Sequence, residues 1–271
     1  MNFLIAVLTS QDEKKLDRCL SSIPTYKHDT VVICNTTLPK YYAKANKICT
    51  KHNVKMVVTE SNGTPGLGKN SVLDYFLQNK EYDYVIPIDG DDYFFPNGVD
   101  KIVEIITQDA TIDVLGLTNT FCTKNKKIYN LTYYEENFLE PPRNTDLTQF
   151  FSFLELFNTH FDNDLNTISK FHRIVVQSRL SAKLCRYDTT LMGCEDMLYS
   201  LQLKKLDLDK KLNFKLFDST NEKIHCYDIN NTENGCSGMF LQRPTFEKRC
   251  QYLNHKAVIL KNSIRHKILY I

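Results

Sequence analysis

The sequence predicts an α/β protein built on a mostly parallel sheet with helices on both faces. Through the first half of the chain, short apolar runs typical of buried strands alternate with longer segments whose apolar residues recur at helical spacing. Alternation of this kind packs as a parallel sheet covered by helices. The chain has 271 residues, of which 42% are hydrophobic and 24% charged, so it can bury a core of its own.

Strands and helices are expected to alternate from the N-terminus to residue 117. The apolar runs expected as strands are Phe3–Leu8, Thr30–Cys34, Val54–Val58, Tyr84–Ile88 and Asp113–Leu117. The segments expected as helices between them are Glu13–Ile23, Tyr41–His52, Lys69–Gln78 and Gly98–Ile106. Because open parallel sheets bind ligands at the carboxyl ends of their strands, polar residues that follow these strands are the candidates for a functional site.

The second half of the chain alternates less regularly. Helices are expected at Thr145–Asn158 and Glu195–Leu203, strands at Phe171–Gln177 and Lys223–Asp228, and a basic amphipathic helix from Arg243 to Ile271. No internal repeat or linker divides the chain. We therefore expect one domain over residues 1–240, with residues 241–271 forming a small helical extension packed on it.

Composition and charge argue against several classes of protein. The 34 Lys and Arg residues balance 32 Asp and Glu residues, so the net charge of +2 indicates no particular partner. The nine cysteines are odd in number and form no C-x-x-C pair, which favours buried thiols in a reducing compartment over disulfides or a zinc site. The apolar run at the N-terminus is too short to span a membrane and follows no basic residue, so a cytoplasmic protein is expected.

Three carboxylates follow the fourth expected strand. Asp89, Asp91 and Asp92 are separated only by Gly90 at the end of Tyr84–Ile88. Carboxylates this close repel one another and raise each other's pKa, and a divalent cation removes that cost. Their hard oxygens suit Mg²⁺ or Mn²⁺, which keep positions open for phosphate and water. The alternative is a solvated Asp-Gly turn before the next helix, which accounts less readily for three acids.

This turn resembles the D-x-D metal motif of GT-A glycosyltransferases. Asp89-Gly90-Asp91-Asp92, after an apolar strand and before the Pro96 turn into a helix, is most similar to the Asp-x-Asp-Asp of the inverting family 2 enzymes. The resemblance implies a GT-A fold, which is Rossmann-like, and a bound nucleotide diphosphate sugar.

A glycine-rich segment raises a rival interpretation. Gly63, Gly68 and Lys69 have the spacing of a phosphate-binding P-loop, between an expected strand and an expected helix. However, Asn70 stands where a P-loop needs a Ser or Thr hydroxyl, and two strand–helix units precede the segment. Family 2 enzymes carry a small-residue turn followed by Arg- or Lys-Asn at this point, and the resemblance places Lys69 and Asn70 near the nucleotide or its diphosphate.

A second acidic pair begins the expected helix Glu195–Leu203. Glu195 and Asp196 at a helix N-terminus are explained by dipole complementation alone. The resemblance gives the pair another role, because family 2 enzymes place a Glu-Asp pair here and use one carboxylate as the general base. A neutral hydroxyl is a poor nucleophile, and a base must reach its proton directly. Asp196 is the expected base, with Glu195 positioning the acceptor or taking that role itself.

The sequence departs from the family at the nucleotide site. The second strand of the family usually ends in acidic residues, whereas here Asn35 follows it and could hydrogen-bond a base edge. The first strand ends in Thr9 and Ser10, in place of the usual Pro-x-Tyr-Asn, and these residues could offer backbone groups to the base. A sugar-1-phosphate nucleotidyltransferase would need its glycine-rich loop after this first strand, where none occurs.

The C-terminal third holds two further candidates. His225, at the expected strand Lys223–Asp228, is placed where many GT-A enzymes bring a late His to the metal, although a lone His is more often structural. From Arg243 onward seven basic residues face one acid, Glu247. This pattern indicates a solvated helix face or, on a sharper interpretation, a surface for an anionic acceptor: nucleic acid, lipid phosphate or a membrane.

Taken in order along the chain, these motifs predict a metal-dependent hexosyl- or pentosyltransferase. Residues 1–118 are expected to form its nucleotide-binding half and residues 119–240 its acceptor-binding half. Asp91, helped by Asp89 or Asp92, would hold Mn²⁺ or Mg²⁺ on the diphosphate of a UDP- or GDP-linked sugar. Asp196 would deprotonate a hydroxyl of the acceptor, which could be modified DNA or another glycan, with inversion as the resemblance implies. A P-loop nucleotide hydrolase that uses Gly63–Asn70 and a non-catalytic nucleotide-sugar-binding module are the alternatives.

Overall fold

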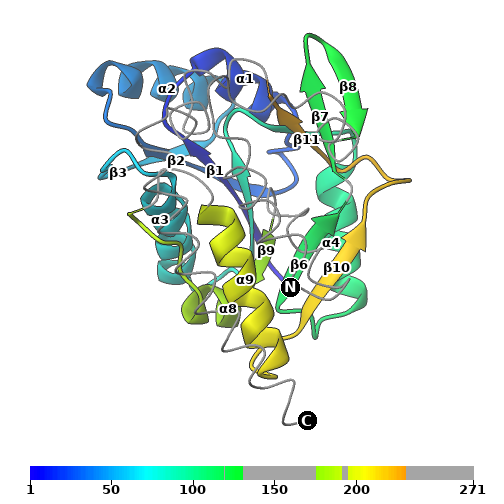
Figure 1. Ribbon diagram of the computed structural model, residues 1–271. Helices are drawn as coiled ribbons and strands as arrows, with labels where there is room; N and C mark the ends of the chain where they lie inside the picture. Colours follow the sequence, from blue (N-terminus) through cyan, green and yellow to red (C-terminus); the bar gives the residue numbers. More distant parts are fainter. Residues whose placement is uncertain (119, 131–174, 191–194, 230–271) are drawn as a thin grey trace, which may run out of the picture.

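The main sheet runs through the centre of the molecule and positions the residues of the candidate functional site. The computed structural model describes residues 1–118, 120–130, 175–190 and 195–229. Within these ranges, seven strands form one sheet in the order β10-β6-β9-β4-β1-β2-β3 (Figure 1). They are β1 (Phe3–Thr9), β2 (Asp29–Asn35), β3 (Lys55–Thr59), β4 (Tyr84–Asp89), β6 (Val114–Thr118), β9 (Val175–Ser178) and β10 (Phe214–Asp218). Neighbouring strands are parallel except at β9, which runs antiparallel between β4 and β6.

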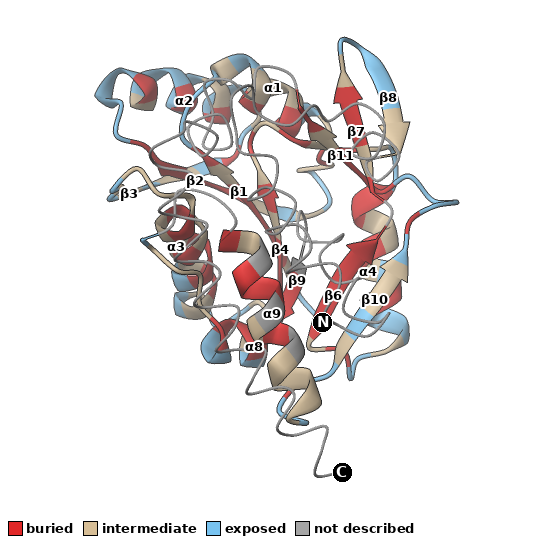
Figure 2. Ribbon diagram, in the orientation of Figure 1, coloured by how far each residue is buried: buried red, intermediate tan, exposed pale blue. Residues whose placement is uncertain are grey.

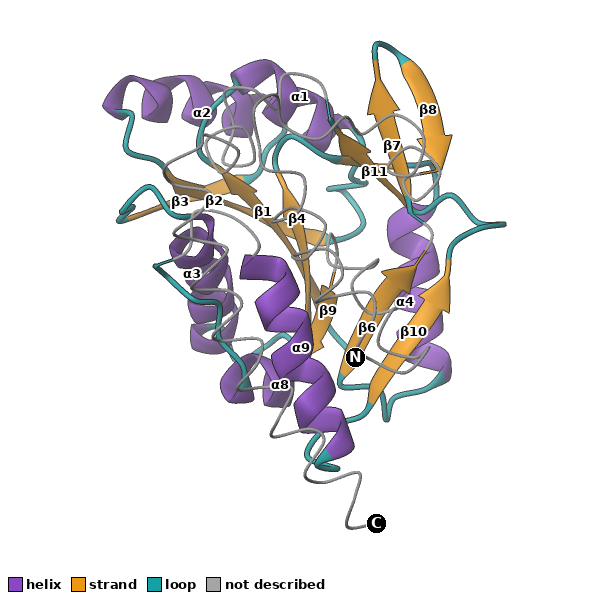
Figure 3. Ribbon diagram, in the orientation of Figure 1, coloured by secondary structure: helices purple, strands orange, loops and turns teal. Residues whose placement is uncertain are grey.

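Helices cover both faces of this sheet (Figure 3). One face packs against α1 (Glu13–Ser21), α2 (Pro39–Lys51) and α4 (Gly98–Gln108). The other packs against α3 (Pro65–Gln78) and α8 (Arg179–Leu184), and α9 (Glu195–Leu208) lies on this side beside α3. Alternate residues of β1 show why both faces need a cover of helices. Ile5 and Val7 are buried under α1, α2 and α4, and Leu4 and Ala6 are buried on the opposite face.

The predicted alternation is confirmed, with element ends shifted by a few residues. In the alternating first half the largest shift is at α3, which begins at Pro65 rather than Lys69, and in the second half α9 continues to Leu208, beyond the predicted end at Leu203. Thr64 caps α3 by accepting a hydrogen bond from the backbone N–H of Leu67, and a proline in the first turn suits a helix start. Gly66 therefore lies inside the helix, where a Cβ would overlap the backbone carbonyl of Asp188. Close packing explains this glycine better than a turn does.

A smaller sheet lies beside the carboxyl end of β4. Its described strands are β5 (Tyr93–Phe94), β11 (His225–Asp228), β7 (Phe121–Lys124) and β8 (Lys127–Asn130), in the order β5-β11-β7-β8. Strand β11 pairs antiparallel with β5, so that His225 lies opposite Phe94. It begins at His225, two residues after the predicted start at Lys223. This pairing brings the C-terminal part of the described chain to the residues that follow β4.

Burial follows the sheet, as the red segments of Figure 2 show. Six cysteines in the described ranges are buried free thiols, as expected: Cys19, Cys34, Cys49, Cys122, Cys185 and Cys226. Among the described residues, no helix is both long and apolar enough to cross a membrane. Three predictions lie outside the described residues: the helix Thr145–Asn158, most of the strand Phe171–Gln177, and the extension 241–271.

Candidate active site

The acidic turn is held against the neighbouring strand β1. Asp89 ends β4, and the backbone N–H of Asp92 donates to the carbonyl of Asp89 over 2.9 Å. Gly90 donates its own N–H to the carbonyl of Leu8 over 2.7 Å, and a Cβ at this position would lie only 3.0 Å from that oxygen. The glycine thus lets the turn approach β1 closely, which fixes where the flanking carboxylates project.

The third carboxylate of the turn is turned inward. Asp92 is 1% exposed, and its Oδ2 lies 3.1 Å from Nε2 of His225, which is fully buried. Its Oδ1 accepts the backbone N–H of Asp228 over 3.0 Å. Asp92 and His225, both predicted metal ligands, therefore lie together, with the carboxylate joining the acidic turn to β11. Nδ1 of His225 is buried and has no hydrogen-bond partner among the described residues.

Two cations of α1 face the same turn. Nη2 of Arg18 lies 2.6 Å from Oδ2 of Asp228 and donates to the carbonyl of Asp91 over 2.5 Å. Nζ of Lys15 lies 3.8 Å from Oδ2 of Asp228 and 4.0 Å from Oδ2 of Asp91. Lys15 and Arg18 are one helical turn apart and so project from the same side of α1. The acidic turn therefore has positive charge on its α1 side.

Burial and mutual repulsion leave two carboxylates of the turn with high proton affinity. Burial, with lesser contributions from Asp92 and Asp91, raises the pKa of Asp89 to about 7, although the charge of Lys69 opposes this. Burial and the charge of Asp92 likewise raise the pKa of Asp91 to about 6, against the effect of Lys15. Carboxylates in this condition suit a hard divalent cation, which would neutralise them.

The side chains at the acidic turn supply only part of the ligands that such a cation needs. Among the described residues, no group of three or more His, Cys, Asp or Glu side chains is close enough to hold a metal by itself. This is compatible with Mg²⁺ or Mn²⁺, which usually take one or two carboxylates from the protein and the remaining ligands from phosphate and water. Asp91 is surrounded closely enough by protein to raise its pKa, yet about half of its side-chain surface reaches solvent, so it offers the accessible oxygens.

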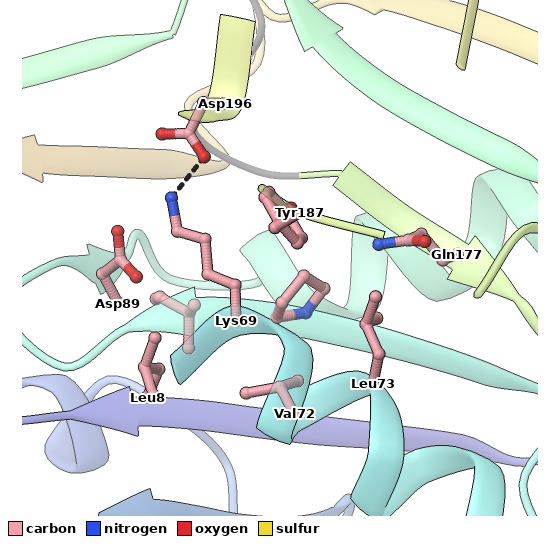
Figure 4. A pocket seen from close by; sticks show the side chains of 10 residues that line it. Leu8, Lys69, Val72, Leu73, Asp89, Gln177, Tyr187 and Asp196 are labelled. Carbon is pink, nitrogen blue, oxygen red and sulfur yellow. Dashed lines mark hydrogen bonds and ion pairs between the residues drawn. The ribbon is translucent and has the colours of Figure 1, made fainter. Parts of the chain in front are cut away.

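The second acidic pair meets Lys69 at the start of α9. Nζ of Lys69 lies 2.8 Å from Oε1 of Glu195 and forms an ion pair with Oδ1 of Asp196 (Figure 4). Although burial opposes it, the charges of Asp196, Glu195 and Asp89 raise the pKa of Lys69 well above its ordinary value. Burial raises the pKa of Glu195, an effect that Lys69 reduces. One buried ammonium thus lies between the two acidic motifs.

A small cavity adjoins these groups. Its volume is about 20 Å³, enough for roughly one water molecule. Its polar lining comes from side chains on five parts of the chain, as Figure 4 shows. They are Lys69 of α3, Asp89 of β4, Gln177 of β9, Tyr187, and Asp196 of α9. The structure therefore brings the predicted Asp-x-Asp-Asp and Glu-Asp motifs to one place at the carboxyl end of β4.

The remaining predicted donor-site residues lie nearby with local partners. Thr9 is buried, and its hydroxyl is 2.5 Å from that of Tyr41. Ser10 is exposed beyond β1. Nδ2 of Asn35 donates to the hydroxyl of Thr59 and the carbonyl of Glu60, which joins the ends of β2 and β3.

Asn70 has a structural contact. Its side chain donates to the carbonyl of Tyr187 and accepts the N–H of the same residue, each over 2.9 Å. This pair of hydrogen bonds holds Tyr187 against α3. Gly66 and Gly68 lie within α3, so most of the glycine-rich segment is a capped helix and not a loop around a phosphate. Lys69 contacts carboxylates, which also argues against a phosphate-binding loop.

Sequence reasoning missed five residues of this site. Lys15, Arg18 and Asp228 contact the acidic turn, and Gln177 and Tyr187 line the cavity. Only weak signals were available: two cations one turn apart in the first helix, and an acid at the end of an expected strand.

No protein-family profile matches the sequence, and no curated protein sequence matches it significantly. Solved structures do match. Residues 1–349 of S. aureus TarS give a TM-score of 0.55 at 17% identity, over 84% of this chain and 60% of that one. The same fragment in complex with UDP-GlcNAc gives 0.54 at 15% identity, over 85% and 59%. The mannosyltransferase PcManGT from Pyrobaculum calidifontis, in complex with GDP-Man and Mn²⁺, gives 0.52 at 14% identity, over 99% and 74%.

These likenesses establish the fold. The chain has the α/β architecture of GT-A glycosyltransferases, which confirms the fold that the sequence predicts. It spans about 60% of the length of the TarS fragment that it matches.

Proposed function

We propose that the protein is a glycosyltransferase that moves a sugar from a nucleotide diphosphate to an acceptor hydroxyl. The observation that carries the proposal is the meeting of Asp89 with Glu195 and Asp196 around the ammonium of Lys69, at the carboxyl end of a central strand. Ligands of open α/β sheets bind at this edge. The GT-A fold supports the same reaction class, since a neighbour of that fold is a mannosyltransferase in complex with GDP-Man and Mn²⁺.

The acidic turn is the proposed diphosphate end of the site. Asp91 would hold Mn²⁺ or Mg²⁺ with help from Asp89 or Asp92, and His225 would support Asp92 or serve as a further ligand. When bound, the cation supplies neutralisation of the charge that develops on the leaving nucleoside diphosphate. Thr9, Ser10 and Asn35, at the ends of β1 and β2, are the residues that we assign to the nucleotide, and a UDP- or GDP-linked donor is proposed.

The Glu195–Asp196 pair is the proposed proton acceptor. Asp196 would take the proton of the acceptor hydroxyl as that oxygen attacks the anomeric carbon, which inverts the configuration, as in the family 2 enzymes that the motifs resemble. Asp196 must then exchange its contact with Lys69 for the substrate hydroxyl. Lys69 stays within reach of Glu195 and keeps the buried site electrically compensated.

The function is tested by ligand-induced thermal stabilisation of the full chain. UDP, GDP, UDP-GlcNAc, GDP-Man and ATP are each added with and without Mn²⁺. We expect a diphosphate ligand to stabilise the chain only with the metal, and Asp91→Asn to abolish the effect. Asp100→Asn, which changes a surface carboxylate paired with Lys27, is the control. Stabilisation by ATP alone, lost in Lys69→Ala, would instead identify a nucleotide hydrolase.

Catalysis is tested separately from binding. Asp196→Asn keeps the shape of the side chain but removes the base, so it should leave donor binding intact and abolish sugar transfer. Transfer at the wild-type rate in Asp196→Asn would refute the assignment of the base. Donor binding by the wild-type chain with no turnover would identify a binding module.

A further inference from the structure

A buried amide stands in the middle of the main sheet. Gln177, on β9, is 0% exposed and lies opposite Val85 of β4. Residues directly paired across antiparallel strands project from the same face, so Gln177 shares the face of Val85, which packs under α3 with Leu73. An aliphatic side chain would satisfy this packing. Packing alone therefore does not explain why a polar carboxamide stands at this position.

Of the two polar atoms of the carboxamide, only the oxygen is hydrogen-bonded to a described residue. The hydroxyl of Tyr199 donates to Oε1 of Gln177. The Tyr199 ring is itself stacked on Tyr187, with ring centroids 3.8 Å apart. Nε2 of Gln177 is buried and has no hydrogen-bond partner among the residues that the structure describes. Buried N–H groups are rarely left unpaired, because the loss of water must be compensated.

The free amide nitrogen faces the small cavity of the candidate site. Figure 4 shows it turned toward Tyr187, on the side where Lys69, Asp89 and Asp196 line the same cavity. At about 20 Å³ the cavity takes roughly one oxygen-sized group. The nearby carboxylates disfavour an anion there. A hydroxyl suits the site, because it can accept a hydrogen bond from Nε2 and donate one to a carboxylate.

The position of the cavity indicates which substrate supplies the hydroxyl. In the proposed reaction the diphosphate lies at Asp91 and the acceptor approaches beyond Asp196. The transferred sugar must lie between these two, where Asp89 and Lys69 flank the cavity. A hydroxyl that enters the cavity from this space belongs to the donor sugar.

We propose that Gln177 is a specificity-determining residue, whose Nε2 donates a hydrogen bond to one hydroxyl of the transferred sugar. The inference rests on the proposed function, and it adds a residue that recognises the sugar and not the nucleotide. Tyr199 is the positioning residue that orients the carboxamide.

The test compares sugar nucleotides with the corresponding nucleoside diphosphates by isothermal titration calorimetry in Mn²⁺. UDP-GlcNAc is measured against UDP, and GDP-Man against GDP, for the wild type, Gln177→Leu and Gln177→Met. We expect either variant to weaken binding of the sugar nucleotide that the wild type prefers by roughly ten-fold, the effect of one hydrogen bond. Affinity for the nucleoside diphosphate should stay unchanged. Ser181→Ala, a buried hydroxyl on α8 outside the cavity, is the matched control.

Two results would overturn the inference. Unchanged affinity for the sugar nucleotide in both variants shows that Nε2 does not contact the donor sugar. Equal weakening of the sugar nucleotide and the nucleoside diphosphate indicates a structural role. Melting temperatures identify a variant that has lost its fold, and the second substitution then decides. If the wild type binds no sugar nucleotide, the proposed function fails first and this inference falls with it.

Discussion

Replacement of Lys69 by methionine tests the charge arrangement at the centre of the site. Methionine keeps most of the aliphatic chain and removes the ammonium, which leaves Glu195 and Asp196 without their cation. At an effective dielectric constant of about 20, the 2.8 Å contact with Glu195 alone corresponds to about 6 kcal/mol of Coulomb attraction before the cost of desolvation. Loss of one partner from a buried ion pair typically costs about 3–5 kcal/mol.

The predicted loss is measurable by thermal and urea unfolding. For a chain of this size a loss of about 3 kcal/mol lowers the melting temperature by roughly 6–12 °C. Lys101→Met is the matched control, because Lys101 also joins two carboxylates, Glu104 and Glu222, but does so at the surface. Exposed ion pairs contribute little, so this control should unfold close to the wild-type temperature.

The cost of Lys69→Met should also depend on pH. Without the ammonium, the pKa of Glu195 rises further, so the carboxyl takes up a proton more readily as the pH falls and sheds its uncompensated charge. The variant should therefore be destabilised more at pH 8 than at pH 5. Equal losses in Lys69→Met and Lys101→Met, or a loss in Lys69→Met that is the same at both pH values, would refute this account of the site.

Three further predictions concern the acidic turn, the packing of α3 and the contact between Asp92 and His225. Asp89 and Asp91 have pKa values of about 7 and about 6, above their ordinary value of 3.8, so the folded chain binds protons more tightly than the unfolded chain. Stability without metal should therefore fall as pH rises from about 4 to about 7, and urea unfolding in EDTA that shows a rise instead would contradict this. Gly66→Ala should cost about 1–3 kcal/mol of unfolding free energy, because its Cβ meets backbone; an unchanged urea midpoint would count against that packing. His225→Phe should cost about 1–3 kcal/mol in urea unfolding, because Asp92 loses a buried hydrogen-bond partner; wild-type stability would show that the contact is dispensable.

Local sequence patterns predicted the elements better than their tertiary contacts. The periodic apolar residues of the first half were sufficient for β1 to β4, for the helices between them and for β6, because each pattern is confined to a few neighbouring residues. The start of α3 was missed because Gly66 is explained by the backbone of Asp188, more than a hundred residues away. The antiparallel direction of β9 has no local signature either.

The residues of the candidate site likewise divide into those that local sequence predicts and those that depend on tertiary contacts. The carboxylates of the two acidic motifs stood out because each cluster is contiguous in sequence. Their partners did not, since the contact of Arg18 with Asp228 joins residues from opposite ends of the described chain. The inward orientation of Asp92 likewise depends on β11, which pairs with β5 only in the folded protein.

The place of β9 in the main sheet has a consequence for how the chain is made. Strands β4 and β6 are both synthesised before β9, yet each pairs with β9. Until residue 178 has left the ribosome, the nascent N-terminal half carries unpaired hydrogen-bonding edges on both strands. Pairings over such sequence separations form late and slowly, and open edges recruit other chains. Strand β9 pairs with both of these edges, and its residue Gln177 lines the cavity. The strand that we expect to limit aggregation of the nascent chain therefore also supplies a residue of the candidate active site.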